Sequence, residues 1–253
     1  QRLEEIRTGG LKSIRFREWG EASISEAVSL LAGCVHVTEL DLREWGTYFK
    51  EDADIETFAG SLRTLTRLQR LDLHETVCMR MFGAATLSEP LGSLTQLQFL
   101  GLGATCPSAD RCEEEASAKA LAKVLGNLTS LRELKLDNND LRDYAFEPLV
   151  GALGKLTGLR TLDLERNDLQ GKGTKYLARA LKMLTGLQDL ELSVNWIAAE
   201  GCTDLAPVLK NLTCLTKLGL RSNSIQFDGA TALAGALKSL TRLQDLDLSS
   251  VFV

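Results

Sequence analysis

The chain of 253 residues lacks the patterns of several protein classes. No apolar run approaches the roughly 20 residues that a membrane-spanning helix needs, and no signal-peptide pattern follows Gln1. The net charge is −5 and the basic residues are scattered along the chain. Such a chain does not attract the phosphate backbone of nucleic acids. We therefore expect no membrane span and no nucleic-acid partner.

Patterns that carry chemistry are also missing. The six cysteines form no C-x-x-C pair, and the only two histidines, His36 and His74, lack the spacing of metal ligands. The length of the chain and its leucine content also argue against a disulfide framework. No phosphate-binding loop, nucleophile–base pair or isolated carboxylate dyad is present in the sequence. The sequence therefore predicts a non-catalytic protein without a metal, a cofactor or a small-molecule substrate.

The residues that are abundant, the leucines, follow a fixed period. The pattern L-x-x-L-x-L begins at five leucines that are 28 residues apart: Leu131, Leu159, Leu187, Leu215 and Leu243. Less regular copies begin at Leu11, Val37, Leu68 and Leu97. Repetition at a fixed period is typical of a solenoid. We therefore expect one domain over residues 1–253, with about nine repeats and nine parallel strands.

Each repeat combines two periodicities. The L-x-L segment alternates as a half-buried strand does, whereas Leu177, Leu181 and Leu184 recur as one face of a helix. Neither element buries its apolar side alone, so neighbouring coils must stack on one another. Four asparagines recur where the chain leaves the strand: Asn139, Asn167, Asn195 and Asn223. We expect their amides to bond backbone groups of the next coil.

This unit, with its Asn, a glycine opening the helix and an L-x-x-x-L helix, resembles the ribonuclease-inhibitor-like class of leucine-rich repeats over residues 11–253. The resemblance implies an α/β horseshoe with a parallel sheet on the concave face and helices on the convex face. It also implies a protein-interaction scaffold that binds a partner on the concave face or the loop edge, as a separate module or as a subunit of a large assembly. One catalytic alternative stays open, a GTPase-activating protein resembling the Ran GTPase activator.

The first and last residues suggest a piece of a longer protein. The chain has no initiator Met, and Val253 follows the ninth predicted strand without a helix to cover it. We expect both ends to be truncated or continued, or the last coil to be covered by a partner. The expected location is cytoplasmic.

On the concave face, residues that alternate with the buried leucines form an acidic strip. Three adjacent strands and the residues that follow them contribute six carboxylates and one lysine: Glu133, Lys135, Asp137, Asp163, Glu165, Asp189 and Glu191. Towards the N-terminus lie several arginines, and Phe99 stands between the two regions. We expect a basic or mixed-charge protein partner to dock on the strip and contact Phe99. The alternative is a solvated face without a partner.

Aromatic residues gather near the N-terminal loop edge. Trp19 and Trp45 occupy the slot that asparagine holds in later repeats, and Tyr48 and Phe49 follow in an insertion. The two tryptophans either fold inward and fill the core, or form with Tyr48 and Phe49 an exposed patch that anchors a protein partner. A second insertion, residues 106–112, contains Cys106 and Cys112, which can pair in an oxidising compartment.

Overall fold

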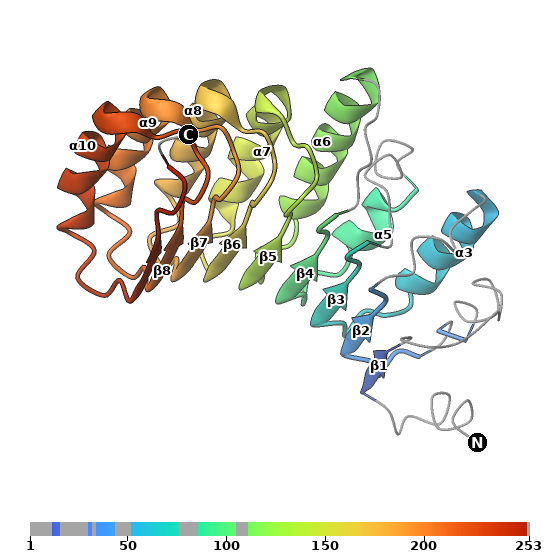
Figure 1. Cartoon of the computed structure of the whole chain (residues 1–253). Coiled ribbons are helices and arrows are strands. Elements are labelled where there is room, and N and C mark those ends of the chain that lie inside the picture. The colour runs from blue at the N-terminus through green and yellow to red at the C-terminus, as the bar shows by residue number, and fades with distance from the viewer. Residues whose placement is uncertain are drawn as a thin grey trace.

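A computed structural model describes residues 12–15, 30–31, 34–43, 52–75, 86–104 and 111–251. Nine strands form one sheet, in chain order and with every neighbouring pair parallel (Figure 1). The strands are β1 Ser13–Arg15, β2 Glu39–Asp41, β3 Arg70–Asp72, β4 Phe99–Gly101, β5 Glu133–Lys135, β6 Thr161–Asp163, β7 Asp189–Glu191, β8 Lys217–Gly219 and β9 Asp245–Asp247. The prediction of nine parallel strands is confirmed.

The helices lie on the convex side of this curved sheet (Figure 1). The described residues contain α3 Asp52–Leu62, α5 Ser88–Gly92, α6 Arg111–Leu125, α7 Asp143–Lys155, α8 Gln170–Leu181, α9 Ala198–Leu209 and α10 Gln226–Leu237. Each packs mainly on its neighbours in sequence, for example α9 on α10. The fold is therefore the predicted α/β solenoid. Within the described residues, no helix is long and apolar enough to cross a membrane.

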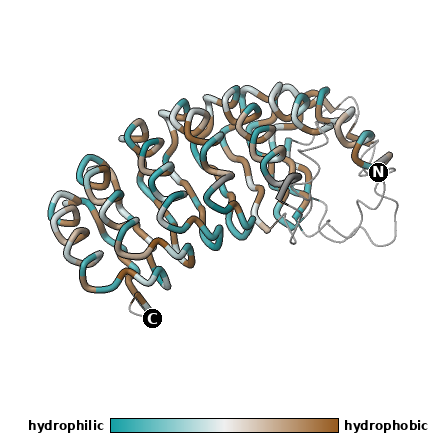
Figure 2. The backbone as a smooth tube through the Cα atoms, turned by 90° about the horizontal axis from the view of Figure 1, so that it is seen from above, coloured by the Kyte–Doolittle hydropathy of each residue, from teal (hydrophilic) through white to brown (hydrophobic). Residues whose placement is uncertain are grey.

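Leucines fill the space between sheet and helices. Leu162 and Leu164 are fully buried, as are their counterparts in neighbouring coils, and all belong to one continuous core. Figure 2 shows these apolar segments recurring in every coil. Burial of each such side chain contributes about 1.5–3 kcal/mol. The helix prediction needs one correction: α8 ends at Leu181, and Leu184 reaches the core from the return turn, where its N–H donates to the Leu181 carbonyl over 3.0 Å.

The four asparagines form a buried ladder between coils. The Asn195 amide donates to the carbonyls of Leu192 at 3.0 Å and of Leu164, in the preceding coil, at 2.7 Å. Its Oδ1 accepts from the backbone N–H of Asn167 at 3.0 Å. The structural role is confirmed but the direction was wrong, because each side chain bonds the preceding coil rather than the next one.

Left-handed residues turn the chain from each strand towards its helix. The residue after each ladder asparagine has a positive φ: 51° at Asp140, 52° at Asp168, 55° at Trp196 and 50° at Ser224. Short polar side chains tolerate this conformation better than bulky ones. The turn fixes where side chains of the loop edge project, so the same slot is presented once per coil.

A glycine near the start of each later helix lets neighbouring helices approach closely. A Cβ added at Gly229 would lie 3.1 Å from the Cα of Ala199, in the preceding helix, and 2.8 Å from Cγ2 of Ile225. These contacts are too close for an ordinary side chain. The repeated glycine is therefore a packing requirement between adjacent coils.

Several predicted features lie outside the described residues. They include the first strand opening, the cysteine and the four aromatic residues at the loop edge: Leu11, Cys106, Trp19, Trp45, Tyr48 and Phe49. Cys112 lies in the first turn of α6 rather than in a loop. Cys202 is buried, and burial raises the pKa of its thiol to about 11, which fits a structural role.

The register predicts unequal costs for two neighbouring substitutions. Leu164→Ala removes a fully buried side chain, so we expect the free energy of unfolding to fall by about 2–5 kcal/mol. Asp163→Ala removes a side chain from the concave face whose ionisation burial disfavours, so at neutral pH we expect no loss of stability, or a gain. Denaturant melts of both variants measure the difference. Equal losses would show that the two side chains do not face opposite sides of the sheet.

Asn195→Ala tests the ladder. It leaves buried carbonyl and N–H groups of two coils without their partner, and each such group costs about 1–3 kcal/mol. We expect a loss of at least roughly 3 kcal/mol in denaturant melts. Asn211→Ala is the matched control, because Asn211 is exposed. A loss no larger than that of the control would rule out a stabilising ladder.

Candidate functional site on the concave face

Three rows of side chains cross the concave face. The parallel register aligns the first and last residues of each strand, and a third row lies two residues beyond each strand. In the central coils these rows read Phe99, Glu133, Thr161, Asp189 and Lys217; Gly101, Lys135, Asp163, Glu191 and Gly219; Gly103, Asp137, Glu165, Ser193 and Arg221. Cross-strand neighbours in a row are about 4.8 Å apart.

The structure brings the predicted acidic strip together on β5, β6 and β7. Glu133, Thr161 and Asp189 are register partners, and so are Lys135, Asp163 and Glu191. Lys135 lies 3.6 Å from Glu133 on its own strand. Within the described residues, no cation lies within salt-bridge distance of Asp163 or Asp189. The two carboxylates at the centre of the strip therefore have no direct ion pair with a described residue.

Burial and neighbouring charges disfavour ionisation in this centre. Burial raises the pKa of Asp163 to about 6, and the negative charges of Asp137 and Glu191 raise it further. The backbone N–H of Glu165, which donates to the carboxylate, partly opposes this shift. Burial also raises the pKa of Asp189, with Lys217 opposing the shift. A cationic ligand would favour the ionised form of both groups.

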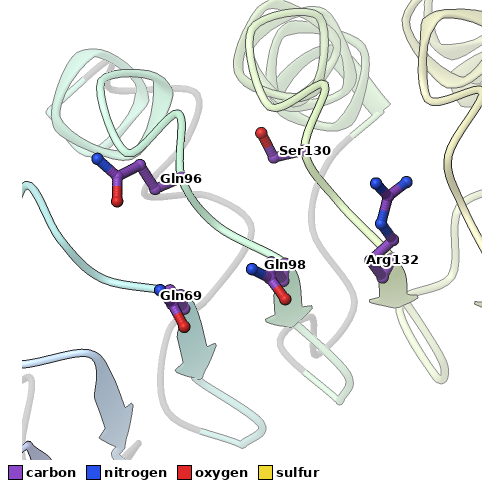
Figure 3. A pocket seen from close by; sticks show the side chains of 5 residues that line it. All are labelled: Gln69, Gln96, Gln98, Ser130 and Arg132. Carbon is purple, nitrogen blue, oxygen red and sulfur yellow. The ribbon is translucent and has the colours of Figure 1, made fainter.

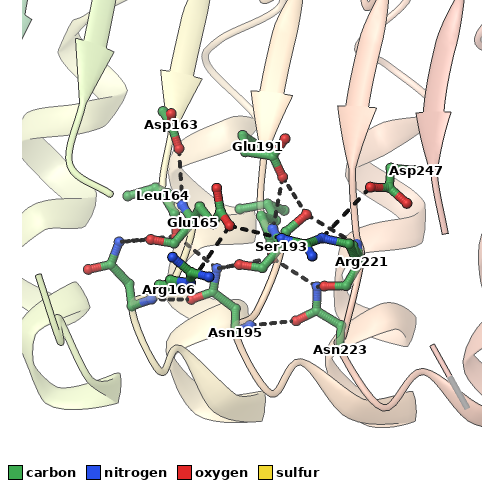
Figure 4. Close-up of polar contacts among 12 residues, drawn as sticks. Asp163, Leu164, Glu165, Arg166, Glu191, Ser193, Asn195, Arg221, Asn223 and Asp247 are labelled. Atoms are coloured by element: carbon green, nitrogen blue, oxygen red, sulfur yellow. Dashed lines mark hydrogen bonds and ion pairs between the residues drawn. The ribbon is translucent and has the colours of Figure 1, made fainter. Parts of the chain in front are cut away.

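Cations from the next coils border the strip, and the sequence reasoning missed them. Arg221 Nη2 lies 3.3 Å from Glu165 Oε1, two strands away (Figure 4). Lys217 Nζ lies 3.9 Å from Glu191 Oε2. Lys217 follows Asp189 of the strip by 28 residues, and Arg221 follows Ser193, in the row of Asp137 and Glu165, by 28 residues. Extending the same rows by one repeat would have found them. These two cations therefore border the strip on its C-terminal side.

A second charged cluster occupies the N-terminal part of the face. The nearly buried carboxylate of Asp72 lies 3.6 Å from Arg43, 3.3 Å from Arg70 and 2.5 Å from Nδ1 of His74. Burial raises its pKa, but the hydrogen bond and charge of His74 and the charge of Arg70 outweigh it, so the pKa lies below its usual value. This cluster neutralises itself.

His74 crosses strand β4 at Gly101 to reach a second carboxylate. Its Nε2 lies 3.2 Å from Oδ1 of Asp137, which is 63 residues further along the chain. The ring occupies the space above Gly101 and Gly103, where a Cβ added to Gly101 would lie 2.7 Å from it. We call this arrangement of Asp72, His74 and Asp137 the histidine bridge. Both glycines are required for it.

The histidine bridge holds its proton tightly. Burial lowers the pKa of His74, but the hydrogen bonds and charges of Asp137 and Asp72 outweigh burial and raise the pKa to about 9. Both ring nitrogens of the imidazolium are donors, so neither offers a lone pair to a substrate or a metal. Among the described residues, no group of His, Cys, Asp and Glu side chains is arranged to hold a metal ion.

Phe99 lies between the two clusters, as the sequence indicated, but it is only 5% exposed. The guanidinium of Arg70 covers its ring, with 3.4 Å between the guanidinium carbon and the ring centroid. Such stacking contributes about 0.5–2 kcal/mol. A partner that approaches Phe99 would meet Arg70 first.

A groove of about 500 Å³ lies at the opposite edge, where the strands begin (Figure 3). Its lining is polar: Gln69, Gln96, Gln98, Ser130 and Arg132. Arg132 Nη1 donates to the carbonyl of Gly158 at 2.8 Å, and Arg160 reaches Gly186 in the same way one coil later. The guanidinium of Arg132 therefore has a structural role, because it links two neighbouring coils.

Comparisons with known proteins agree with this repeat. A family model described as "Leucine Rich repeat" matches residues 155–178 and 211–234, two segments that begin two repeats apart. The solved structure of the leucine-rich repeat-containing protein LegL7 from Legionella pneumophila is 18% identical, with a TM-score of 0.53, over 96% of this chain and 85% of that chain.

A second solved structure, an internalin (inlF) from Listeria monocytogenes, is 17% identical over 98% of this chain and 89% of that chain. Its TM-score of 0.32 is too low to bear on the fold. A comparison with curated proteins gives no match.

The histidine bridge predicts a pH-dependent contribution to stability. The pKa of His74 is about 9 in the folded chain against an ordinary 6.5, so the folded state binds the proton more tightly. The contribution is fully present below pH 6.5 and is lost as the pH rises through about 9. We expect the difference in free energy of unfolding between wild type and His74→Gln to shrink over this window, by up to about 3 kcal/mol.

Proton NMR of the imidazole resonances checks the same point directly. The chain has two histidines, and the variant His36→Gln assigns the signal of His74. A midpoint near 9 is expected for His74. A midpoint near the ordinary value of 6.5 would show that the bridge does not form in solution.

Proposed function

We infer the function of this chain from the family to which it belongs: it is a leucine-rich repeat protein, and such proteins share a scaffold rather than a reaction. We propose that it is a non-catalytic interaction module that binds a protein partner on its concave face or the adjoining loop edge. The partner is basic or of mixed charge. The module acts alone or as a subunit of a larger assembly.

The observation that carries this proposal is the acidic centre of the concave face. No helix of the described residues covers this face (Figure 1), and burial raises the pKa values of both Asp163 and Asp189. The fold holds these carboxylates in register at a cost to their ionisation. Cationic side chains of a partner would remove that cost, because an opposite charge at short range favours the ionised form.

We also assign the repeats to the ribonuclease-inhibitor-like class. The support is the 28-residue period and the full helix of 12 residues in each of α8, α9 and α10. We also propose a cytoplasmic location, the expectation stated from the sequence.

Charge reversal on the two faces tests the proposal. Glu133→Lys with Asp189→Lys places cations at the centre of the strip, whereas Glu147→Lys with Asp204→Lys makes the same change in net charge on the convex helices α7 and α9. Each purified, folded variant is immobilised and exposed to extract from the source cells, and bound proteins are quantified by mass spectrometry. We expect at least one protein to be retained by wild type and the convex variant, and to be reduced tenfold or more on the concave variant. Identical retention by all three proteins would contradict the proposal.

A hydrolysis assay tests the non-catalytic part. The chain is added to a panel of small GTPases loaded with GTP, and phosphate release is measured with and without it. We expect unchanged rates. Faster hydrolysis by any one GTPase would favour the alternative of a GTPase activator.

A further inference from the structure

Two aromatic side chains are exposed at the loop edge in adjacent coils. Trp196, between β7 and α9, is 62% exposed, and Phe227, in the first turn of α10, is 79% exposed. Their turns are in direct contact, because the Ala198 N–H donates to the Asn223 carbonyl at 2.9 Å. Two large apolar side chains are thus exposed to solvent on turns that touch each other.

The fold does not need an aromatic residue in either slot. In sister coils the slot of Trp196 holds Asp140, Asp168 and Ser224, and all four residues have a positive φ between 50° and 55°. A bulky residue in this conformation is unusual and strained, at a cost of about 1–3 kcal/mol.

The slot of Phe227 is equally permissive, since sister coils place Asp143, Gly171 and Ala199 there. Neither aromatic ring contributes to the ladder or to the continuous core. Their exposure at adjacent positions is a property of the surface.

The coil that carries Trp196 also carries the acidic strip. Asp189 and Glu191 face the concave side from β7, and Trp196 follows Glu191 by five residues on the same coil. Carboxylates flank the aromatic pair as well, with Glu200 and Asp228 exposed in the first turns of α9 and α10. The coil that carries Trp196 therefore has carboxylates on its concave face, and further carboxylates lie beside both aromatic residues at the edge.

We propose that Trp196 and Phe227 are the apolar anchor for the partner that docks on the acidic strip. This inference rests on the proposed function. It specifies the ligand as a protein segment in which lysines or arginines are followed by a large apolar side chain. The basic residues lie over Asp163 and Asp189, and the apolar side chain packs on the aromatic pair at the edge.

Charge complementarity favours this occupant over two others. A second copy of the chain would bring a like-charged strip to the same surface, since the net charge is −5. An anionic lipid surface would be repelled by the same carboxylates. A segment with basic and apolar side chains complements both the acidic strip and the exposed rings of Trp196 and Phe227.

The experiment uses random 16-residue peptides displayed on phage as the probe. Peptides selected on the wild-type chain are synthesised, and their affinities are measured by fluorescence anisotropy. The test variant is W196S with F227A, which restores residues that sister coils carry in these slots and so preserves the fold. Its matched control is Met183→Ser, because Met183 is 56% exposed but lies in the turn after α8, away from the loop edge. The strip variant is Glu133→Lys with Asp189→Lys.

We expect selected peptides to contain both basic and large apolar residues. Their affinity should fall at least tenfold on W196S/F227A and on the strip variant, and change less than twofold on Met183→Ser. Replacing the apolar residue of the peptide by Ser should cause the same loss on wild type and little further loss on W196S/F227A.

Other results would overturn the inference. Loss on the strip variant with full affinity on W196S/F227A would remove the anchor and leave the proposed function standing. Full affinity on both variants would contradict both proposals. Failure to select any peptide, dimerisation of wild type that W196S/F227A abolishes in sedimentation, or binding of wild type to vesicles through these residues would also reject this ligand.

Discussion

The structure depends on satisfying buried backbone groups where each coil turns away from the sheet. Each ladder asparagine donates to carbonyls of its own and the preceding coil, and Asn167, Asn195 and Asn223 also accept an N–H from the preceding coil. An unpaired backbone group in this position would be costly. Because the ladder admits one alignment of adjacent coils, the register of the strands follows from it. The leucines then fall on the inside and the variable residues on the concave face.

A fixed register forces charges on neighbouring strands close to one another. Like charges opposite each other destabilise a sheet. On this face, two cations reach carboxylates across a strand: His74 contacts Asp137 over β4, and Arg221 contacts Glu165. Among the described residues, no cation from another strand lies within ion-pair distance of Asp163 or Asp189. Whether a carboxylate on this face is neutralised therefore depends less on its neighbours in sequence than on which cations reach it across the sheet.

Much of this arrangement could be predicted from the sequence, because the repeat specifies both the strands and the side of the sheet that each residue occupies. The strands begin two residues after the opening leucines, since those leucines belong to the preceding turn. The histidine bridge could not be predicted, because it joins residues 63 apart in the sequence. It also depends on the absence of side chains at Gly101 and Gly103, whose space the ring occupies. Covering of Phe99 by Arg70 also depends on rotamers rather than on period. The exposure of Trp196 follows from the turn conformation, which the repeat pattern does not reveal.

The histidine bridge also limits how such an array can change by duplication or loss of coils. Where neighbouring coils make only the contacts that every repeat makes, one coil can be added or removed and each type of contact is preserved. His74 instead joins the coils of β3 and β5 across Gly101 and Gly103 of the coil between them. The bridge therefore forms only when all three coils are present in this order. Recombination inside this block would leave a cation or a carboxylate without its counterpart. We expect the block to be inherited intact while copy number varies around it.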